Sequence, residues 1–224
     1  MARTTTRYVN FLTLQNRGRS AVTVVKLMMA CNDMSLANEA LSQWKEQPGA
    51  LTFRQAGAKV YFAQLEFSHL YEALDIIQEL RNDPALLAVV KRCDVQTQAS
   101  LQKLADFLPD GAKRNEFEQR LGRIRNNLTF HYEESGRLIE RAIADRSARA
   151  DATLSSITRG DSMHYWRFNV ADDVVDSIVV RQLWAIARNA DLREEIDSVA
   201  DWAHDIILAF VDFAGEFIWK YCEP

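Results

Sequence analysis

The feature that most constrains the fold of this chain is its scarcity of helix breakers. The 224 residues include only four prolines and eight glycines. These breakers fall between long stretches in which apolar residues recur every three or four positions, as they do on the buried face of an amphipathic helix. No alternating strand pattern is present. The sequence therefore predicts an all-α protein, an antiparallel bundle of about six helices in which any strands are short.

The breakers also set the limits of the predicted helices. Pro48-Gly49 separates the first two helices, Asp83-Pro84 opens the third, and Pro109-Asp110-Gly111 closes it. Asp172 or Asp173 is a suitable N-cap for a fifth helix, and Asp191 for a sixth. Apart from the third, the helices are predicted at about 20–45, 55–81, 115–148, 172–188 and 191–221, with an irregular loop at about 151–171. We expect a single all-helical domain over 1–224, with a four-helix core and an additional helical pair.

Two of these helices carry long apolar seams at helical spacing. Such seams let neighbouring helices interlock their side chains. On the second helix the seam consists of Val60, Ala63, Phe67, Leu70, Leu74 and Ile77. On the sixth it consists of Ile196, Val199, Ala203, Ile206, Phe210, Phe213 and Phe217. We expect both seams to face the core.

Composition and charge narrow the classes of protein that fit. The most apolar segments, 22–31 and 206–214, are interrupted by Lys26 and Asp212, so we expect no signal peptide and no membrane span. Cys31, Cys93 and Cys222 are far apart and form no CxxC pair, so we expect neither a disulfide framework nor a cysteine zinc site, and a cytoplasmic location. The net charge of -4 disfavours nucleic-acid coating by bulk electrostatics.

The only local motif with a plausible chemistry lies in the fourth predicted helix, at Arg125-Asn126-Asn127-Leu128-Thr129-Phe130-His131. His131 stands at a seam position where the pattern calls for an apolar residue, and Asn127 and Glu134 lie one turn away on the same face. Arg125 lies about 120° around the helix from it. One interpretation is structural: a core histidine bonded to Asn127 or Glu134, with an ordinary surface arginine.

The second interpretation comes from a resemblance. The stretch from Ile124 to Tyr132 resembles the motif of the HEPN superfamily. In that motif an arginine, usually followed by a polar residue, is separated from a histidine by four to six intervening residues inside a helical bundle. Here the interval is five residues and Asn126 is the polar residue. The motif also lies in a segment, 113–149, with nine basic and six acidic residues. The net charge of this segment is therefore +3, which an ordinary solvent-exposed helix face would also explain.

The resemblance implies a metal-independent endoribonuclease, or a relic of a toxin or defence system that binds RNA or nucleotide without cutting it. His131 would be the general acid or base at the ribose 2′-hydroxyl, and Arg125 would hold the scissile phosphate. Asn126 would orient either His131 or the phosphate by hydrogen bonding. No metal ligand or cofactor is implied, because RNA is cut through its own 2′-hydroxyl. The family's usual arrangement predicts a homodimer whose two motifs share one cleft, and an antitoxin-like protein is a second expected partner.

A different class of function is suggested by the other histidines. Glu66-x-x-His69 and Asp201-x-x-His204 each place a carboxylate and an imidazole on one helix face. Di-iron and di-manganese bundles, which are often oxidoreductases, use this arrangement. Asp33 or Glu39, and Glu134 beside His131, would complete such a set. A structural hydrogen bond is the alternative for each pair.

A third class is a non-catalytic helical interaction protein. Five tryptophans and the aromatic cluster around Trp166 could anchor a protein partner, although core positions explain most of them equally well. The chain contains no glycine-rich phosphate loop, nucleophile elbow or HExxH motif. P-loop nucleotide hydrolysis, serine-hydrolase chemistry and zincin proteolysis are therefore disfavoured.

Overall fold

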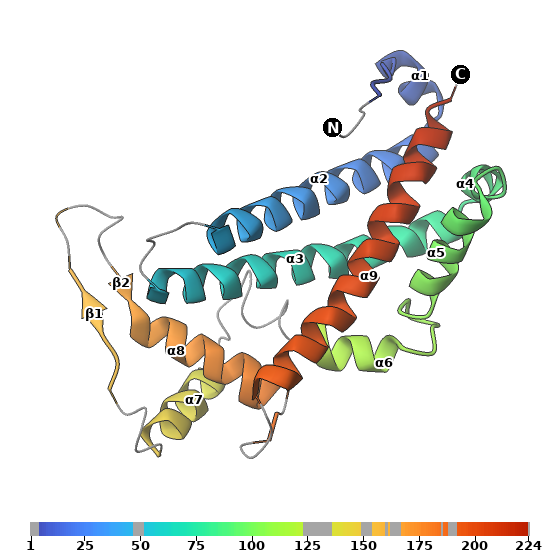
Figure 1. The fold of residues 1–224 in the computed structure, drawn as a ribbon. Coiled ribbons are helices and arrows are strands. Elements are labelled where there is room, and N and C mark those ends of the chain that lie inside the picture. The colour runs from blue at the N-terminus through green and yellow to red at the C-terminus, as the bar shows by residue number, and fades with distance from the viewer. Residues whose placement is uncertain are drawn as a thin grey trace.

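The prediction of an all-α bundle is confirmed. The structure is a computed structural model that describes residues 5–46, 52–122, 136–148, 154–159, 161, 167–184, 186–187 and 192–223. Within these residues nearly all regular structure is helical (Figure 1). The strands there are as short as expected: β1 (Ile157–Thr158) pairs antiparallel with β2 (Arg167–Phe168), and Ile157 lies opposite Phe168.

Three long helices, α2 (Arg19–Glu46), α3 (Thr52–Arg81) and α9 (Leu192–Tyr221), form the centre of the fold. Their bounds confirm the first, second and sixth predicted helices to within three residues. α2 and α3 lie antiparallel along most of their length, and α9 crosses both of them (Figure 1). On its other side α9 packs along α5 (Val95–Ala105). These four helices supply most of the core.

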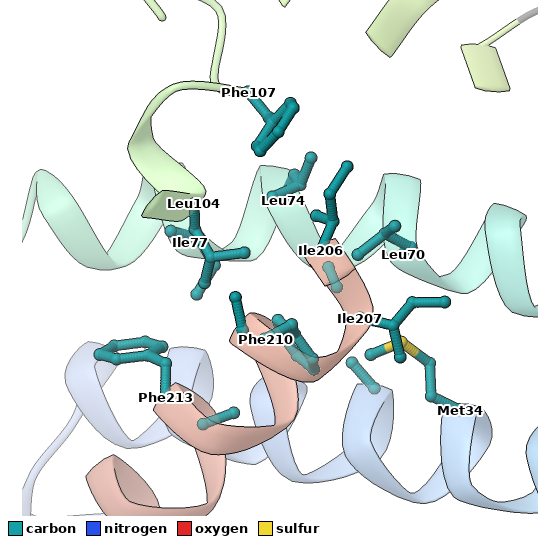
Figure 2. Close-up of a cluster of buried hydrophobic side chains, with 14 of the residues drawn as sticks. Met34, Leu70, Leu74, Ile77, Leu104, Phe107, Ile206, Ile207, Phe210 and Phe213 are labelled. Atoms are coloured by element: carbon teal, nitrogen blue, oxygen red, sulfur yellow. The ribbon is translucent and has the colours of Figure 1, made fainter. Parts of the chain in front are cut away.

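The predicted seams do face this core. On α3 the seam residues Phe67, Leu70, Leu74 and Ile77 are buried and Ala63 is partly buried, and on α9 every described seam residue from Val199 to Phe217 is buried. Figure 2 shows side chains of α2, α3, α5 and α9 gathered in one cluster. Phe210, Phe213 and Phe217 are fully enclosed there, one helical turn apart on α9. Their burial makes α9 a main link between the α2–α3 pair and α5.

The predicted third helix is wrong, because the chain forms two helices there. α4 (Pro84–Val90) ends at Lys91, and α5 starts afresh after Asp94. The Asp94 carboxylate accepts a hydrogen bond of 2.7 Å from the Thr97 amide, which caps the new helix. Asp94 is a second N-cap aspartate, eleven residues after Asp83, and it divides the region into two short helices. Both helices pack against α9.

Asp83 is the junction between α3, α4 and the start of α2. Its carboxylate caps α4 by accepting from the Ala85 and Leu86 amides, and it also accepts from the Ser20 hydroxyl of α2. The Ser20 hydrogen bond and, to a smaller extent, the backbone hydrogen bonds hold the pKa of Asp83 below its usual 3.8. The stability gained from this carboxylate is thus present above pH 3.8 and is lost as the pH falls below it.

We expect Asp83→Ala to lower the free energy of unfolding by about 1–2 kcal/mol, because it removes a helix cap and the partner of Ser20. Asp83→Asn, which keeps an N-cap acceptor, should cost less. Urea titration at neutral pH measures both values. Equal losses in the two variants would show that the cap is not the stabilising interaction.

The predicted fourth and fifth helices are also wrong in their limits. α6 (Arg114–Phe117) continues into a π-helical segment, η1 (Glu118–Gly122), and α7 (Arg137–Ser147) starts after Gly136. Gly136 has a φ of 68°, a left-handed conformation that ends any helix reaching it from Asn115. α8 (Asn169–Ser177) begins inside the predicted loop and continues into a second π-helical segment, η4 (Ile178–Leu183).

A short N-terminal helix, α1 (Phe11–Asn16), was not predicted, and no residue of it is buried. Two arginines that flank α1 fix this segment to the end of α9. Arg7 donates to the Trp219 carbonyl and Arg17 to the Tyr221 carbonyl, and each guanidinium also stacks on the ring of the same residue. Cations are favourable at a helix C-terminus, which explains this docking. No described helix is long and apolar enough to cross a membrane.

Candidate functional site

The three residues predicted to act in catalysis, Arg125, Asn126 and His131, lie outside the described residues, as does Glu134. We refer to residues 123–135 as the motif segment. The structure describes both of its flanks: η1 ends at Gly122 on one side, and α7 begins after Gly136 on the other. The surroundings of the site can therefore be built from these flanks.

The flank before the motif segment is fixed by a polar cluster of Tyr71, Arg114 and Glu118. The Tyr71 hydroxyl donates to the Glu118 carboxylate at 2.8 Å and accepts from the Arg114 guanidinium at 3.0 Å. Arg114 also pairs with Glu118 directly, and its side chain is only 16% exposed. Half-buried, charge-assisted contacts of this kind hold a helix end firmly, here the first turn of η1 against α3.

Two details show how closely this cluster is packed. A Cβ atom added to Gly122 would lie 2.1 Å from a Glu118 carboxylate oxygen and 3.3 Å from the Tyr71 ring, so a larger residue would require the Glu118 side chain to move. Burial and the hydrogen bond to Glu118 raise the pKa of the Tyr71 phenol above its usual 10.0. Tyr71 is thus a protonated hydrogen-bond donor at neutral pH and has no role as a base there.

Both flanks are attached to the same short segment, η4 and the residue after it. The Trp184 indole donates to the Arg120 carbonyl in η1 at 3.0 Å. Gln182, two residues earlier, donates to the Leu138 carbonyl in α7 at 2.8 Å. We call this pair of hydrogen bonds the η4 clamp. If residues 120–138 formed one continuous helix, Arg120 and Leu138 would lie about 27 Å apart. The side chains of Gln182 and Trp184, which are two residues apart in the chain, could not span that distance. The two described ends of the motif segment therefore lie near each other.

A pocket lies beside the second flank, between α7 and η4. Its volume is about 560 Å³, and its lining combines two arginines, Arg141 and Arg181, with Asp145, Ser177, Gln182 and small aliphatic side chains. We call it the arginine pocket. Arg181 is oriented by the Ile186 and Ala187 carbonyls, to which it donates at 2.8 Å. Arg141 is exposed and forms no ion pair or hydrogen bond with the rest of the described chain.

Two buried polar groups lie in the lining of this pocket. Ser177 is buried and donates to Asp145 at 3.4 Å, which partly occupies the one carboxylate in the lining. The Gln182 side-chain oxygen is enclosed and has no donor in the structure. An enclosed acceptor without a donor is costly and is normally matched by water or a ligand. The pocket thus offers cationic donors for an anion.

The two carboxylate–histidine pairs do not meet. Glu66 is buried on α3, and the imidazole of His69 beside it lies 3.9 Å from the Asp33 carboxylate of α2. Asp201 and His204 are both exposed on α9, and Glu39 is exposed on α2. Nowhere in the described part of the chain do three or more metal-binding side chains come together. The expected di-metal arrangement across α3 and α9 is therefore not formed by these residues.

The tryptophans described by the structure mostly serve the core or the clamp. Trp202 packs on the Phe107 and Phe117 rings, with centroids 5.9 and 6.2 Å apart, and Arg120 stacks over its ring. Trp184 belongs to the η4 clamp. The side chains of Trp44 and Trp166 lie outside the described residues. Trp219, at the end of α9, is 36% exposed, and the Arg7 guanidinium stacks on its ring. The described tryptophans therefore do not gather into one exposed aromatic patch of the kind that the interaction-protein hypothesis needs.

None of the cysteines is suited to nucleophilic catalysis. All three are free. Burial raises the pKa of the Cys31 thiol to about 11, and burial is also the main cause of the raised pKa values of Cys93 and Cys222. The thiolate, which is the reactive form, is therefore scarce at neutral pH.

Neither the cluster around Tyr71 nor the η4 clamp could be identified from the sequence, because each joins residues 40 or more positions apart. Comparisons with protein-family models, with curated proteins and with solved structures found no match.

Proposed function

We propose that this protein binds RNA and cuts it without a metal ion, in the manner that its resemblance to the HEPN superfamily implies. The observation that carries the proposal is the Arg125–His131 motif, situated in a segment whose two described ends are held close together by the η4 clamp. Such an arrangement fixes the chain on both sides of the reactive residues, as preorganised catalysis requires.

The chemistry assigned to the motif balances without a cofactor. His131 takes the proton from a ribose 2′-hydroxyl, and the 2′-oxygen attacks the adjacent phosphorus. The bond from phosphorus to the 5′-oxygen breaks, that oxygen takes a proton from water, and the protonated His131 returns its proton to the solvent. The products are a 2′,3′-cyclic phosphate and a 5′-hydroxyl. Arg125 stabilises the negative charge that accumulates on the phosphoryl oxygens, and Asn126 orients the reacting groups.

The arginine pocket supports RNA as the substrate class. It lies beside the flank that leads out of the motif segment, and it presents Arg141 and Arg181 to solvent-accessible space. A second phosphate of the same RNA strand would fit these donors. The pocket provides local positive charge in a chain whose net charge is -4.

The test is digestion of a mixed-sequence RNA by the purified full chain, with and without EDTA. We expect cleavage that EDTA does not reduce, because no step uses a metal ion. Cleavage that disappears with EDTA, together with about two metal ions per chain by elemental analysis, would favour the di-metal alternative. RNA binding that weakens with salt but leads to no cleavage would identify a non-catalytic relic.

A further inference from the structure

A second surface, independent of the proposed ribonuclease function, lies on the outer face of α2. Four apolar side chains are exposed there: Val22 (55%), Val25 (37%), Met29 (59%) and Leu36 (64%). Their spacing of three, four and seven residues places all of them within about 40° of one line along the helix. We call this line the α2 stripe. It is about 21 Å long and faces away from the core that the opposite side of α2 packs against.

The α2 stripe has the spacing of one strand of a two-helix coiled coil. Val22, Met29 and Leu36 are seven residues apart, and Val25 and Asn32 occupy the positions between them. A helix face of this type is complete only when a second helix supplies the opposing side chains. No described element of the same chain covers these residues, since each of the four is at least 37% exposed.

The sequence of the stripe indicates that the opposing helix is α2 of a second copy, antiparallel to the first. With Met29 on the two-fold axis, Val22 of one copy lies opposite Leu36 of the other, because both are seven residues from Met29. A surface that meets itself in this way forms an isologous two-fold contact. No other part of the chain has to rearrange to supply the partner face.

The charges along one edge of the stripe fit the same arrangement. Lys26 precedes Met29 by three residues and Asp33 follows it by four, and both lie on the edge next to α3, where they pair with Glu79 and His69. In an antiparallel pair centred on Met29, Lys26 of each copy lies beside Asp33 of the other. In a parallel pair the two copies of this edge would lie on opposite sides of the contact, so Lys26 and Asp33 of different copies would not meet.

We therefore infer that the chain forms a homodimer through the α2 stripe, with two antiparallel α2 helices and Met29 at the axis. This contact differs from a dimer in which two motifs share one cleft. α3 packs against α2 on one side, and η1 and α8 lie on the other side of it (Figure 1). The dimer thus leaves each motif-segment flank remote from the axis.

The first experiment is sedimentation equilibrium of the full chain at micromolar concentration. We expect a mass twice the 25.6 kDa of one chain. Met29→Glu should shift the protein to the monomer, because it places two carboxylates at the axis. Val95→Glu is the matched control, since Val95 is an exposed apolar residue outside the stripe, and it should leave the dimer unchanged. A monomeric native chain, or a Met29→Glu variant that remains dimeric with normal circular dichroism, would overturn the inference.

The second experiment tests the antiparallel arrangement. Under mild oxidation Met29→Cys should form a covalent dimer, because the two introduced thiols meet at the axis. Val22→Cys should form no more covalent dimer than the native chain does. The two copies of residue 22 would lie about 21 Å apart, which is beyond the reach of a disulfide. Equal cross-linking of both variants would indicate a parallel pair, and cross-linking of neither would exclude this contact.

Discussion

Replacing His131 by alanine is expected to reduce RNA cleavage at least about 100-fold while the protein remains folded. General acid–base catalysis by one positioned side chain contributes roughly 10²–10⁴ to a rate, and His131 is the group assigned to it. The rate should be measured with a fluorogenic RNA in the presence of EDTA, under single-turnover conditions that separate binding from the chemical step. RNA affinity should change little, because the phosphate contacts of Arg125 and the arginine pocket remain.

The matched control is His204→Ala. His204 is exposed on α9 and belongs to no part of the proposed site, so cleavage should stay at the native rate. A corresponding pair compares Arg125→Ala with Arg92→Ala, another exposed arginine. If His131→Ala and His204→Ala cut RNA equally well, the cleavage does not use the motif.

The second large effect is on stability. Phe210→Ala should lower the free energy of unfolding by about 3–5 kcal/mol, because it removes a fully buried ring and leaves a cavity among α3, α5 and α9 (Figure 2). For a chain of this size that loss corresponds to a decrease of roughly 10 °C in Tm. Calorimetry and urea titration measure both quantities.

Leu208→Ala is the control on the same helix. Leu208 is 46% exposed, only two positions from Phe210, so its replacement should cost well under half as much. A similar loss for the two variants would mean that α9 does not present the seam at Val199–Phe217 to the core.

Periodicity was sufficient to predict the long helices. α2, α3 and α9 each bury one regular face, so the spacing of Leu70, Leu74 and Ile77, or of Phe210, Phe213 and Phe217, identified both the helix and its buried side. The split between α4 and α5 was missed because it depends on Asp94 acting as a second cap, and an aspartate within a helical pattern is equally compatible with an exposed position.

The errors around the site have a different physical origin. Gly136 adopts a left-handed conformation, but an isolated glycine in a helical pattern is often tolerated, so the pattern predicts a helix that continues through it. The η4 clamp depends on contacts between Trp184 and Arg120 and between Gln182 and Leu138, which no local pattern encodes. The sequence therefore contains the motif proposed to react, but it does not encode the contacts that hold the flanks of the motif segment together.

The most direct test of the central claim is the chemical nature of the RNA ends produced in the presence of EDTA. Attack by the 2′-hydroxyl predicts 2′,3′-cyclic phosphates and 5′-hydroxyls, detectable by mass spectrometry of a defined oligonucleotide. It also predicts no cleavage of the same oligonucleotide when a 2′-deoxy residue precedes the cut. Products with 3′-hydroxyls and 5′-phosphates, or cleavage of the deoxy-substituted strand, would contradict a reaction carried by Arg125 and His131.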